Sequence, residues 1–370
     1  MKRVVICTSV HPHDDVRIFH KEAVTLVQAG YDITLLNHEY SGDKSGVRFI
    51  RVPVEQNRVG RIAGSWLRYA RAALAQHPDI CHLHDPELLP AGLWLKRRGI
   101  QVIYDAHEDL PKQIHGKQWI PKYLRGGAAG GAAGVEHYAA RRFDLIFCAT
   151  ELIAQRFMGI TNHVISLHNY PILAEFPLLA QQPRERAVCY VGALAENRGL
   201  LQMVQAASLA GVRLYLAGRF ETQNLQHKVR RMGGRNTVYL GVLGREQVAE
   251  LMSRCSAGLV TLHPTPAYVQ SVPIKLLEYL AAGLPAIASD FPYWRTLLDG
   301  IDCAVFVNPA DTHEIAQAML SLTNAPERAT ELGQNGRRGV ETRYCWEQER
   351  KKLLQGYASL INEKSGKAGR

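Results

Sequence analysis

The chain has 370 residues, 46% of them hydrophobic and 21% charged, which is typical of a globular protein and excludes a disordered or fibrous one. At about 150 residues per domain this length predicts two domains, and no apolar run approaches the roughly 18 residues of a membrane span. The formal net charge of +10 favours anionic partners, namely nucleotide diphosphates, anionic lipids or nucleic acid, without choosing among them. The scattered cysteines, and a first strand that begins at Val4 directly after Met1, Lys2 and Arg3, predict a cytoplasmic protein with reduced thiols and no signal peptide.

The first half of the chain repeats a short β-branched run followed by a helical pattern. Residues 4–8 predict a strand, 18–28 a helix that stops at Gly30, and 32–36 a second strand. Further strands are predicted at 79–83, 101–104, 145–149 and 163–167. This alternation is typical of a parallel sheet with helices on both faces.

Two segments interrupt the pattern. Residues 126–134 consist only of glycine and alanine, and because glycine is costly inside a helix we expect a mobile loop or a tightly packed helix start there. Residues 171–186 are rich in proline and polar residues and predict a linker. The predicted organisation is an N-terminal domain at 1–170, this linker, a C-terminal domain at 187–343 and a final helix and tail at 344–370.

A second series of strands follows the linker. They are predicted at 187–191, 213–217, 238–241, 257–262, 286–289 and 304–307. The fold class is therefore α/β, with two doubly wound domains in tandem. Ligands of such sheets bind at the carboxyl ends of the strands, so a tandem pair offers a cleft between its domains.

The strongest motif runs from Ser271 to Ser289. Pro273 lies near a predicted helix start, and Gly283 ends that helix before a buried strand. The free N–H groups and positive dipole of the helix N-terminus favour an anion, and Lys275 lies close by. This pattern predicts a diphosphate site with the Glu278 carboxylate within reach of ribose hydroxyls.

The same segment resembles the GT-B glycosyltransferases, specifically the family 4 bacterial sugar transferases, whose signature is two glutamates separated by seven residues. Glu278 matches the second glutamate, which in the family binds the donor ribose. Gln270 stands where the first one contacts the transferred sugar; it can hydrogen-bond hydroxyls but supplies no negative charge. The resemblance implies two Rossmann-like domains facing each other across a cleft, a nucleotide-sugar donor, no cofactor, and retention of configuration. It also implies that the final helix crosses back to the N-terminal domain.

A second motif of the C-terminal half begins at Gly192, after a buried strand, and ends at Arg198. A glycine there lets backbone approach a ligand, and an arginine at the next helix start pairs with phosphate oxygens. The family carries a further basic residue where this chain has Ala193, and Lys275 or Arg219 could compensate. The donor-binding residues predicted in this half are Gly192, Arg198, Gly218, Arg219, Ser271, Lys275, Leu276 and Glu278.

Three polar clusters follow strands of the first half, at 11–22, 82–87 and 104–109, and should converge on one sheet edge. By resemblance His107 faces the transferred sugar. The predicted catalytic residues are His107, Gln270 and Asp14; the predicted acceptor-binding residues are His13, Asp15, Arg17, His84, Asp85 and Glu108. Asp14 or Asp15 could instead simply cap the following helix. A metal site could be read from His82, His84, Asp85, His107, Glu108 and Asp109, but the family usually needs none, so we expect no metal.

Two segments mix cations with aromatic residues. They contain Arg58, Arg61, Ile62, Trp66, Arg68, Tyr69 and Arg71 in the first, and Lys112, Lys117, Trp119, Lys122, Tyr123 and Arg125 in the second. Either these are ordinary amphipathic helices that cover their own core, or they contact a lipid-linked acceptor at an anionic membrane surface. The sequence leaves both open.

The predicted function is transfer of a sugar from a UDP- or GDP-sugar to a saccharide or lipid-linked saccharide, in bacterial polysaccharide or glycoconjugate synthesis. A sugar-nucleotide 2-epimerase of the same fold is an alternative. A nucleic-acid-binding role would rest on charge alone and is not expected. A dinucleotide-dependent dehydrogenase is nearly excluded, because residues 8–15 contain no glycine where its GxGxxG turn belongs.

Overall fold

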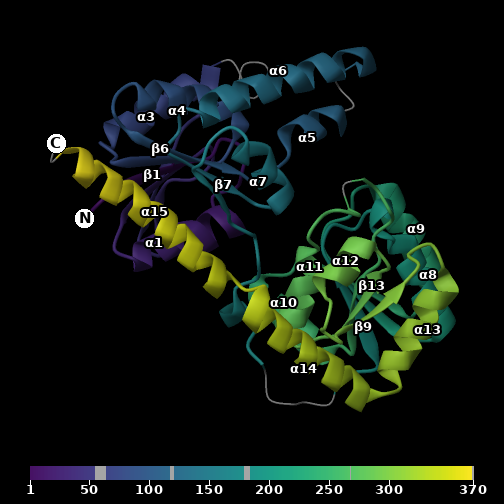
Figure 1. Cartoon of the computed structure of the whole chain (residues 1–370). Coiled ribbons are helices and arrows are strands. Elements are labelled where there is room, and N and C mark those ends of the chain that lie inside the picture. Colours follow the sequence, from purple (N-terminus) through teal and green to yellow (C-terminus); the bar gives the residue numbers. More distant parts are fainter. Residues whose placement is uncertain (55–63, 117–120, 179–183, 267, 369–370) are drawn as a thin grey trace. The chain divides into compact units, whose positions relative to one another are not determined.

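The computed structural model describes residues 1–54, 64–116, 121–178, 184–266 and 268–368, and the chain forms two compact units (Figure 1). Unit 1 contains Met1–Asn169 and Gln348–Arg370, and unit 2 contains Tyr170–Glu347. The predicted linker is part of unit 2: Tyr170, just before it, and Phe176 within it pack into that unit's core. The chain therefore changes units directly after Asn169 and again after Glu347.

The sheet of unit 1 has eight strands in the described residues and is parallel except at one edge. In spatial order they are β3 (Gly42–Lys44), β4 (Val47–Arg51), β2 (Asp32–Asn37), β1 (Arg3–Cys7), β5 (Ile80–Leu83), β6 (Gln101–Ala106), β7 (Leu145–Cys148) and β8 (Val164–Ser166). Only β3, which was not predicted, pairs antiparallel, with β4. β4 was also not predicted, although Val47 and Phe49 alternate toward the core as a strand requires.

Helices cover this sheet. They are η1 (Val16–Ala23, a π-helical segment), α1 (Val24–Gln28), α3 (Trp66–Ala75), η3 (Pro86–Leu88), α4 (Leu89–Lys96), α5 (Leu110–Gly116), α6 (Lys122–Ala140), α7 (Glu151–Met158) and α15 (Trp346–Ala368, yellow in Figure 1). α15 enters unit 1 at Gln348, and its Tyr357 is fully buried there. A Cβ on Gly356 would lie 2.8 Å from side-chain atoms of Leu145 and Phe147, so this glycine allows the helix to approach β7 closely.

The glycine- and alanine-rich segment is the interior of α6, which is a correction to both expected forms. The helix runs without a break from Lys122 to Ala140, and the space beside its glycines is open rather than packed. Ala129, Glu136 and Ala139 are buried on its inner face. Tertiary packing of that face outweighs the low helix propensity of glycine.

The sheet of unit 2 has six strands in the described residues, all parallel. In spatial order they are β11 (Thr237–Gly241), β10 (Arg213–Ala217), β9 (Ala187–Val191), β12 (Ala257–Val260), β13 (Ala286–Ser289) and β14 (Ala304–Val307). The helices are η4 (Leu173–Glu175), η5 (Glu196–Arg198), α8 (Leu200–Ala210), α9 (Gln223–Gly233), α10 (Arg245–Arg254), α11 (Ile274–Ala281), α12 (Pro292–Leu297), α13 (Thr312–Thr323) and α14 (Pro326–Arg343).

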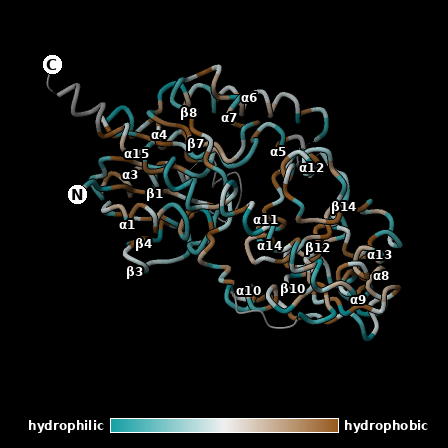
Figure 2. The backbone as a smooth tube through the Cα atoms, turned by 60° about the horizontal axis from the view of Figure 1, so that its bottom comes forward, coloured by the Kyte–Doolittle hydropathy of each residue, from teal (hydrophilic) through white to brown (hydrophobic). Residues whose placement is uncertain are grey.

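Alternate residues of β9 enter different hydrophobic clusters of unit 2. Ala187, Cys189 and Val191 belong to one, and Val188 and Tyr190 to the other. A strand covered on both faces carries apolar residues at nearly every position. Figure 2 colours the backbone by hydropathy, with hydrophobic residues in brown. None of the described helices combines the length and apolarity needed to cross a membrane.

The strand order reverses once in each sheet, between β1 and β5 in unit 1 and between β9 and β12 in unit 2. Loops that leave such neighbouring strands in opposite directions open a crevice at their carboxyl ends, where ligands of doubly wound sheets bind. These two reversal points are therefore where each unit should hold its functional residues.

Candidate active site

At the reversal point of unit 2, β9 and β10 are each followed by a glycine, Gly192 and Gly218, and the backbones of these two glycines are in contact. A Cβ on Gly218 would lie 1.8 Å from the carbonyl oxygen of Gly192, and Gly218 has a φ of +143°, so no other residue fits this position without a shift. The N–H of Gly192 donates to the oxygen of Ala217 at 2.9 Å. Bare backbone is thus presented at the ends of both strands, where a phosphate group could approach.

Arg198 is the last residue of the short helix η5, and this helix packs against and is hydrogen-bonded to the loop after β12. Gly199 follows with a φ of +73°, and a Cβ there would lie 2.0 Å from the carbonyl oxygen of Thr261. The N–H of His263 donates to the oxygen of Asn197 at 3.1 Å. The Arg198 guanidinium lies 5.6 Å from the ring centre of Tyr268. The reversal point therefore carries a partly exposed cation in a fixed place.

The loop after β10 is joined to the same region. The N–H of Leu194 donates to the oxygen of Arg219 at 2.9 Å, so the loops after β9 and β10 are hydrogen-bonded to each other. The Arg219 side chain itself is exposed. It is thus placed beside Gly192 and Gly218 with its charge in solvent.

α11 begins directly after Pro273, at the other side of the reversal point. Lys275 Nζ lies 2.6 Å from Glu278 Oε2, and both side chains are partly exposed. Leu276 is fully buried, so only its backbone could meet a donor. Ser271 is occupied within the protein: its hydroxyl donates to Tyr268, and its carbonyl accepts from Trp294 Nε1 at 3.0 Å. Gln270 is exposed in the preceding turn.

The motif search overlooked His263 and Tyr268. His263 Nε2 lies 3.2 Å from Gln202 Oε1, which ties the loop after β12 to α8. In the first half of the chain, histidines shortly after apolar strands indicated candidate site residues. The same signal, applied to the strand before His263, could have identified this residue.

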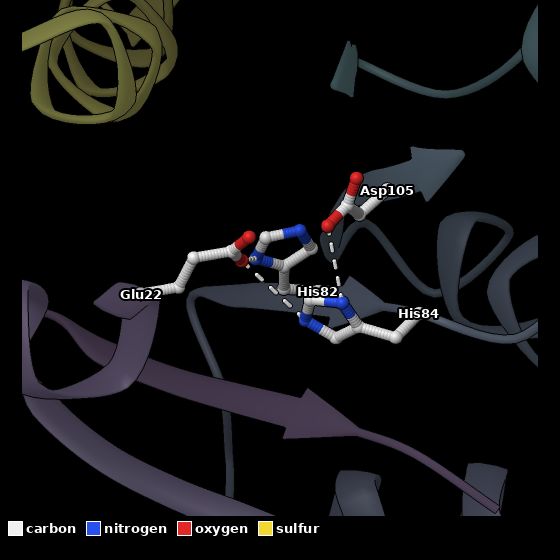
Figure 3. Close-up of side chains that lie close together, drawn as sticks. All are labelled: Glu22, His82, His84 and Asp105. Atoms are coloured by element: carbon white, nitrogen blue, oxygen red, sulfur yellow. Dashed lines mark ion pairs between the residues drawn. The ribbon is translucent and has the colours of Figure 1, made fainter. Parts of the chain in front are cut away.

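In unit 1 a buried polar network lies beneath the reversal point (Figure 3). Arg17 donates to both oxygens of Asp105, at 2.6 and 2.8 Å, and to the carbonyl oxygen of Leu167 at 2.8 Å. Its Nε also lies 3.1 Å from Glu22 Oε1. His84 Nδ1 lies 3.2 Å from Asp105 Oδ2. The network joins η1, the end of β5 and β6.

The charges in this network are set by the cation among them. Burial by itself raises the pKa of Asp105, but the Arg17 guanidinium and the contact with His84 together outweigh burial and hold that pKa well below its ordinary value. Burial and the neighbouring Asp105 charge raise the pKa of Glu22 well above its ordinary value. Glu22 therefore holds its proton more tightly than Asp105 does, and the guanidinium pairs with both oxygens of Asp105.

Two predicted acceptor contacts are corrected by this geometry. Arg17 is 5% exposed and His84 is fully buried, and both face the network instead of solvent. Neither can touch an acceptor without rearrangement. Their polar groups compensate one another's burial, which gives them a structural role beneath the site.

Asp85 is 3% exposed and holds the loop after β1. Its Oδ2 accepts from the Thr8 hydroxyl at 2.9 Å, from Ser9 N and Oγ at 2.6 and 3.2 Å, and from Val10 N at 3.3 Å. Direct acceptor contact through this oxygen is thus also corrected. Asp85 Oδ1 remains on the side of His11, 3.4 Å from its Nε2.

His107 meets His11 above the network. Their Nε2 atoms are 3.0 Å apart and their rings meet edge to face. Burial lowers the pKa of His107 to about 4. The Asp15 carboxylate raises the pKa of His11. The two rings therefore differ in proton affinity, and His11 is the better donor of the pair.

The other predicted residues of unit 1 lie around this pair. Asp15 Oδ1 caps η1 by accepting from the N–H groups of Arg17 and Ile18 at 2.8 and 3.0 Å. Burial alone would raise the pKa of Asp15. The hydrogen bonds that its carboxylate accepts outweigh burial and lower this pKa to about 2. His13 Nδ1 lies 2.7 Å from Glu39 Oε1. Asp14 and Glu108 are exposed, and Glu108 accepts from Gln113.

Sequence reasoning could not find the link between His82 and the last helix. His82 Nδ1 lies 2.9 Å from the hydroxyl of Tyr357, although the two residues are 275 positions apart. No local pattern signals such a contact. It joins α15 to the side of the network that contains Glu22.

The two mixed basic and aromatic segments differ in the structure. Tyr69 of the first is fully buried and donates to the oxygen of Thr8 at 2.9 Å, so it covers its own core. In the second, Tyr123 is 85% exposed at the start of α6, beside Lys122 and Arg125. Several members lie outside the described residues, namely Arg58, Arg61, Ile62, Lys117 and Trp119.

Comparison with known proteins identifies both halves. The protein-family model described as "Glycosyl transferase 4-like domain" matches residues 16–169. The family model described as "Glycosyl transferases group 1" matches residues 185–325. The MMP alpha-(1->4)-mannosyltransferase of Mycolicibacterium hassiacum is 22% identical over 316 residues, which cover 80% of this chain and 74% of that protein.

Solved structures share the fold over nearly the whole chain. Sucrose-phosphate synthase from Thermosynechococcus elongatus has a TM-score of 0.76 at 17% identity and covers 98% of this chain and 100% of its own. Anabaena HepE, solved in complex with UDP and glucose, has a TM-score of 0.71 at 12% identity and covers 97% and 100%. The predicted fold of two Rossmann-like domains is confirmed.

Proposed function

The chain belongs to the group 1 glycosyltransferases of the GT-B type, and we propose that it transfers a hexose from a UDP- or GDP-sugar to a saccharide or lipid-linked saccharide. The products would be bacterial polysaccharides or glycoconjugates. A relative is a mannosyltransferase, and a structural neighbour was solved with UDP and glucose, which supports a nucleotide-hexose donor.

The observation that carries this proposal is the arrangement at the reversal point of unit 2. Two side-chain-free turns, Gly192 and Gly218, lie beside Arg198, and the Lys275–Glu278 pair lies near the start of α11. Bare N–H groups, a helix N-terminus and cations are what a diphosphate requires. We assign Arg198 and Lys275 to the diphosphate and Glu278 to the ribose.

In the proposed reaction the departing diphosphate is stabilised by these cations and by the helix dipole, so transfer needs no metal. We assign Gln270 and His107 to the transferred sugar, Gln270 as a hydrogen-bonding partner of its hydroxyls. Asp14 and His13 contact the acceptor from the exposed part of the loop after β1. The configuration at the anomeric carbon is retained. A GT-B 2-epimerase would share the donor site but would need no acceptor.

The donor is tested by thermal unfolding with UDP, GDP and a panel of their hexose derivatives. The expected result is a higher unfolding midpoint with one nucleotide series, since a ligand at about 100 times its Kd adds about 2.7 kcal/mol. Product analysis with saccharide acceptors, with and without a chelator, then follows the sugar. Conversion of the donor into an isomeric sugar nucleotide without acceptor would favour the epimerase, and no stabilisation by any nucleotide would contradict the proposal.

We further propose that unit 1 meets an anionic membrane surface through the start of α6, which would bring a lipid-linked acceptor to the enzyme. Tyr123 and Leu124 are 85% and 51% exposed, beside Lys122 and Arg125. An aromatic and an aliphatic side chain flanked by cations suit the boundary between headgroups and acyl chains.

Replacing Tyr123 and Leu124 together by serine is expected to reduce cosedimentation with anionic vesicles, because apolar contact is lost while the charge is kept. Binding of the unchanged protein should fall as salt rises. Leu209→Ser, at a leucine of unit 2 that is 58% exposed, is the control. Equal binding of the protein to neutral and anionic vesicles would exclude the electrostatic part of this proposal.

A further inference from the structure

Three ligand atoms of unit 1 converge at its reversal point. His11 Nε2 lies 3.0 Å from His107 Nε2 and 3.4 Å from Asp85 Oδ1, and all three atoms lie within 4.8 Å of one another. Two ligands at about 2.0–2.1 Å from one tetrahedral ion are separated by roughly 3.3 Å. The spacing of His11 from both partners is therefore close to that of ligands around a single ion.

We propose that His11, Asp85 and His107 form a Zn²⁺ site with three protein ligands and a fourth position open to water. Two imidazoles and one carboxylate are a donor set that zinc binds. His11 lies on the loop after β1, Asp85 follows β5, and His107 follows β6. The ligands thus come from three neighbouring strand ends whose positions are fixed by the parallel sheet.

Groups around the ligands hold two of them in the orientation that a metal requires. Asp85 Oδ2 accepts all the hydrogen bonds from Thr8, Ser9 and Val10 described above, which leaves Oδ1 directed toward His11. His11 Nδ1 lies 3.7 Å from Asp15 Oδ2, on the side of the ring away from the proposed ion. A carboxylate behind a metal-binding histidine fixes the orientation of its ring.

The deeper cluster of Glu22, His82, His84 and Asp105 has a similar composition but does not suit an ion. The Arg17 guanidinium already lies 3.1 Å from Glu22 and 2.6 Å from Asp105. Figure 3 shows how the four side chains lie. All four are fully buried, so a hydrated ion has no direct access. The His11 side chain, in contrast, is 27% exposed.

Zinc at this place occupies His107 Nε2 and would stop glycosyl transfer, so the ion is an inhibitor and not a requirement for turnover. This consequence rests on the proposed function, in which His107 faces the transferred sugar. The binding itself does not depend on that role. All seven cysteines are buried, so no exposed thiol competes for the metal.

The test is calorimetric titration of untagged, chelator-treated protein with Zn²⁺, followed by Co²⁺ as a coloured substitute. One Zn²⁺ per chain is expected, and Co²⁺ should show the intense visible absorption of a four-coordinate site. His11→Ala should weaken Zn²⁺ binding by more than about 100-fold, and Asp15→Asn by about 10-fold, since outer partners contribute about 10- to 100-fold. His227→Ala, at an exposed histidine of unit 2, should leave binding unchanged.

Circular dichroism establishes that each variant is folded before titration. Absence of Zn²⁺ binding, or equal affinity in folded His11→Ala and unchanged protein, overturns the site. Zinc binding at these ligands without loss of transfer would leave the site in place and remove His107 from the reaction. Failure of every nucleotide to bind would contradict the proposed function without affecting the titration result.

Discussion

Replacing Arg17 by methionine is expected to lower the free energy of unfolding of unit 1 by about 3–5 kcal/mol, because it leaves the buried Asp105 carboxylate without its cation. Both oxygens of Asp105 accept from this guanidinium, and both residues are buried. Methionine retains most of the side-chain length, so the loss reports charge more than volume. Urea unfolding followed by circular dichroism measures the change, with the transition of each unit fitted separately.

A matched surface pair in the same unit provides the control. Lys2 Nζ lies 3.3 Å from Asp79 Oδ1, and the two side chains are 41% and 29% exposed. Lys2→Met should therefore cost only about 0–1 kcal/mol. Removing both buried charges, with Arg17→Met and Asp105→Leu together, should recover part of the loss, since no unpaired charge remains. An Arg17→Met protein with unchanged unfolding would show that the buried pair is not what stabilises this region.

Glu278→Ala is expected to weaken nucleotide binding by about 10- to 100-fold, because a hydrogen bond to a charged group contributes about 1.5–3 kcal/mol. The loss should be similar for the nucleoside and the nucleoside diphosphate, since ribose is common to both. Arg198→Ala should weaken the diphosphate far more than the nucleoside, because only the diphosphate carries charge. Calorimetric titration of both variants with both ligands gives the comparison.

Arg213→Ala is the control for charge. Arg213 is an exposed arginine at the amino end of β10, at the opposite edge of the sheet from Arg198. Its removal lowers the net charge equally but should leave both affinities unchanged. Equal losses for nucleoside and diphosphate in Arg198→Ala would remove this residue from the phosphate site, and unchanged affinities in folded Glu278→Ala would remove Glu278 from the ribose.

The hydrophobic pattern located every strand of the two sheets in the described residues except β3 and β4. β9, β10, β13 and β14 have the predicted bounds, because short, mostly apolar runs between turns leave little freedom in their ends. β4 was missed although it alternates, and α6 was mistaken because tertiary contacts of its inner face decide the conformation of a glycine-rich segment.

The proposed donor-binding residues Gly192, Arg198, Lys275 and Glu278 lie in short motifs whose turns and helix start are local, so the sequence alone could nominate them; their role stays a prediction. In unit 1 the sequence indicated that three polar clusters meet at one sheet edge, because parallel strands end there together. It could not indicate which members are buried.

Only the tertiary structure decided that Arg17 pairs with Asp105, 88 positions away, and that His82 meets Tyr357, 275 positions away. The physical reason is that burial and charge compensation depend on which distant side chains share a space, whereas secondary structure depends on neighbours in the chain. The same registration of β1, β5 and β6 brings His11, Asp85 and His107 within reach of one ion.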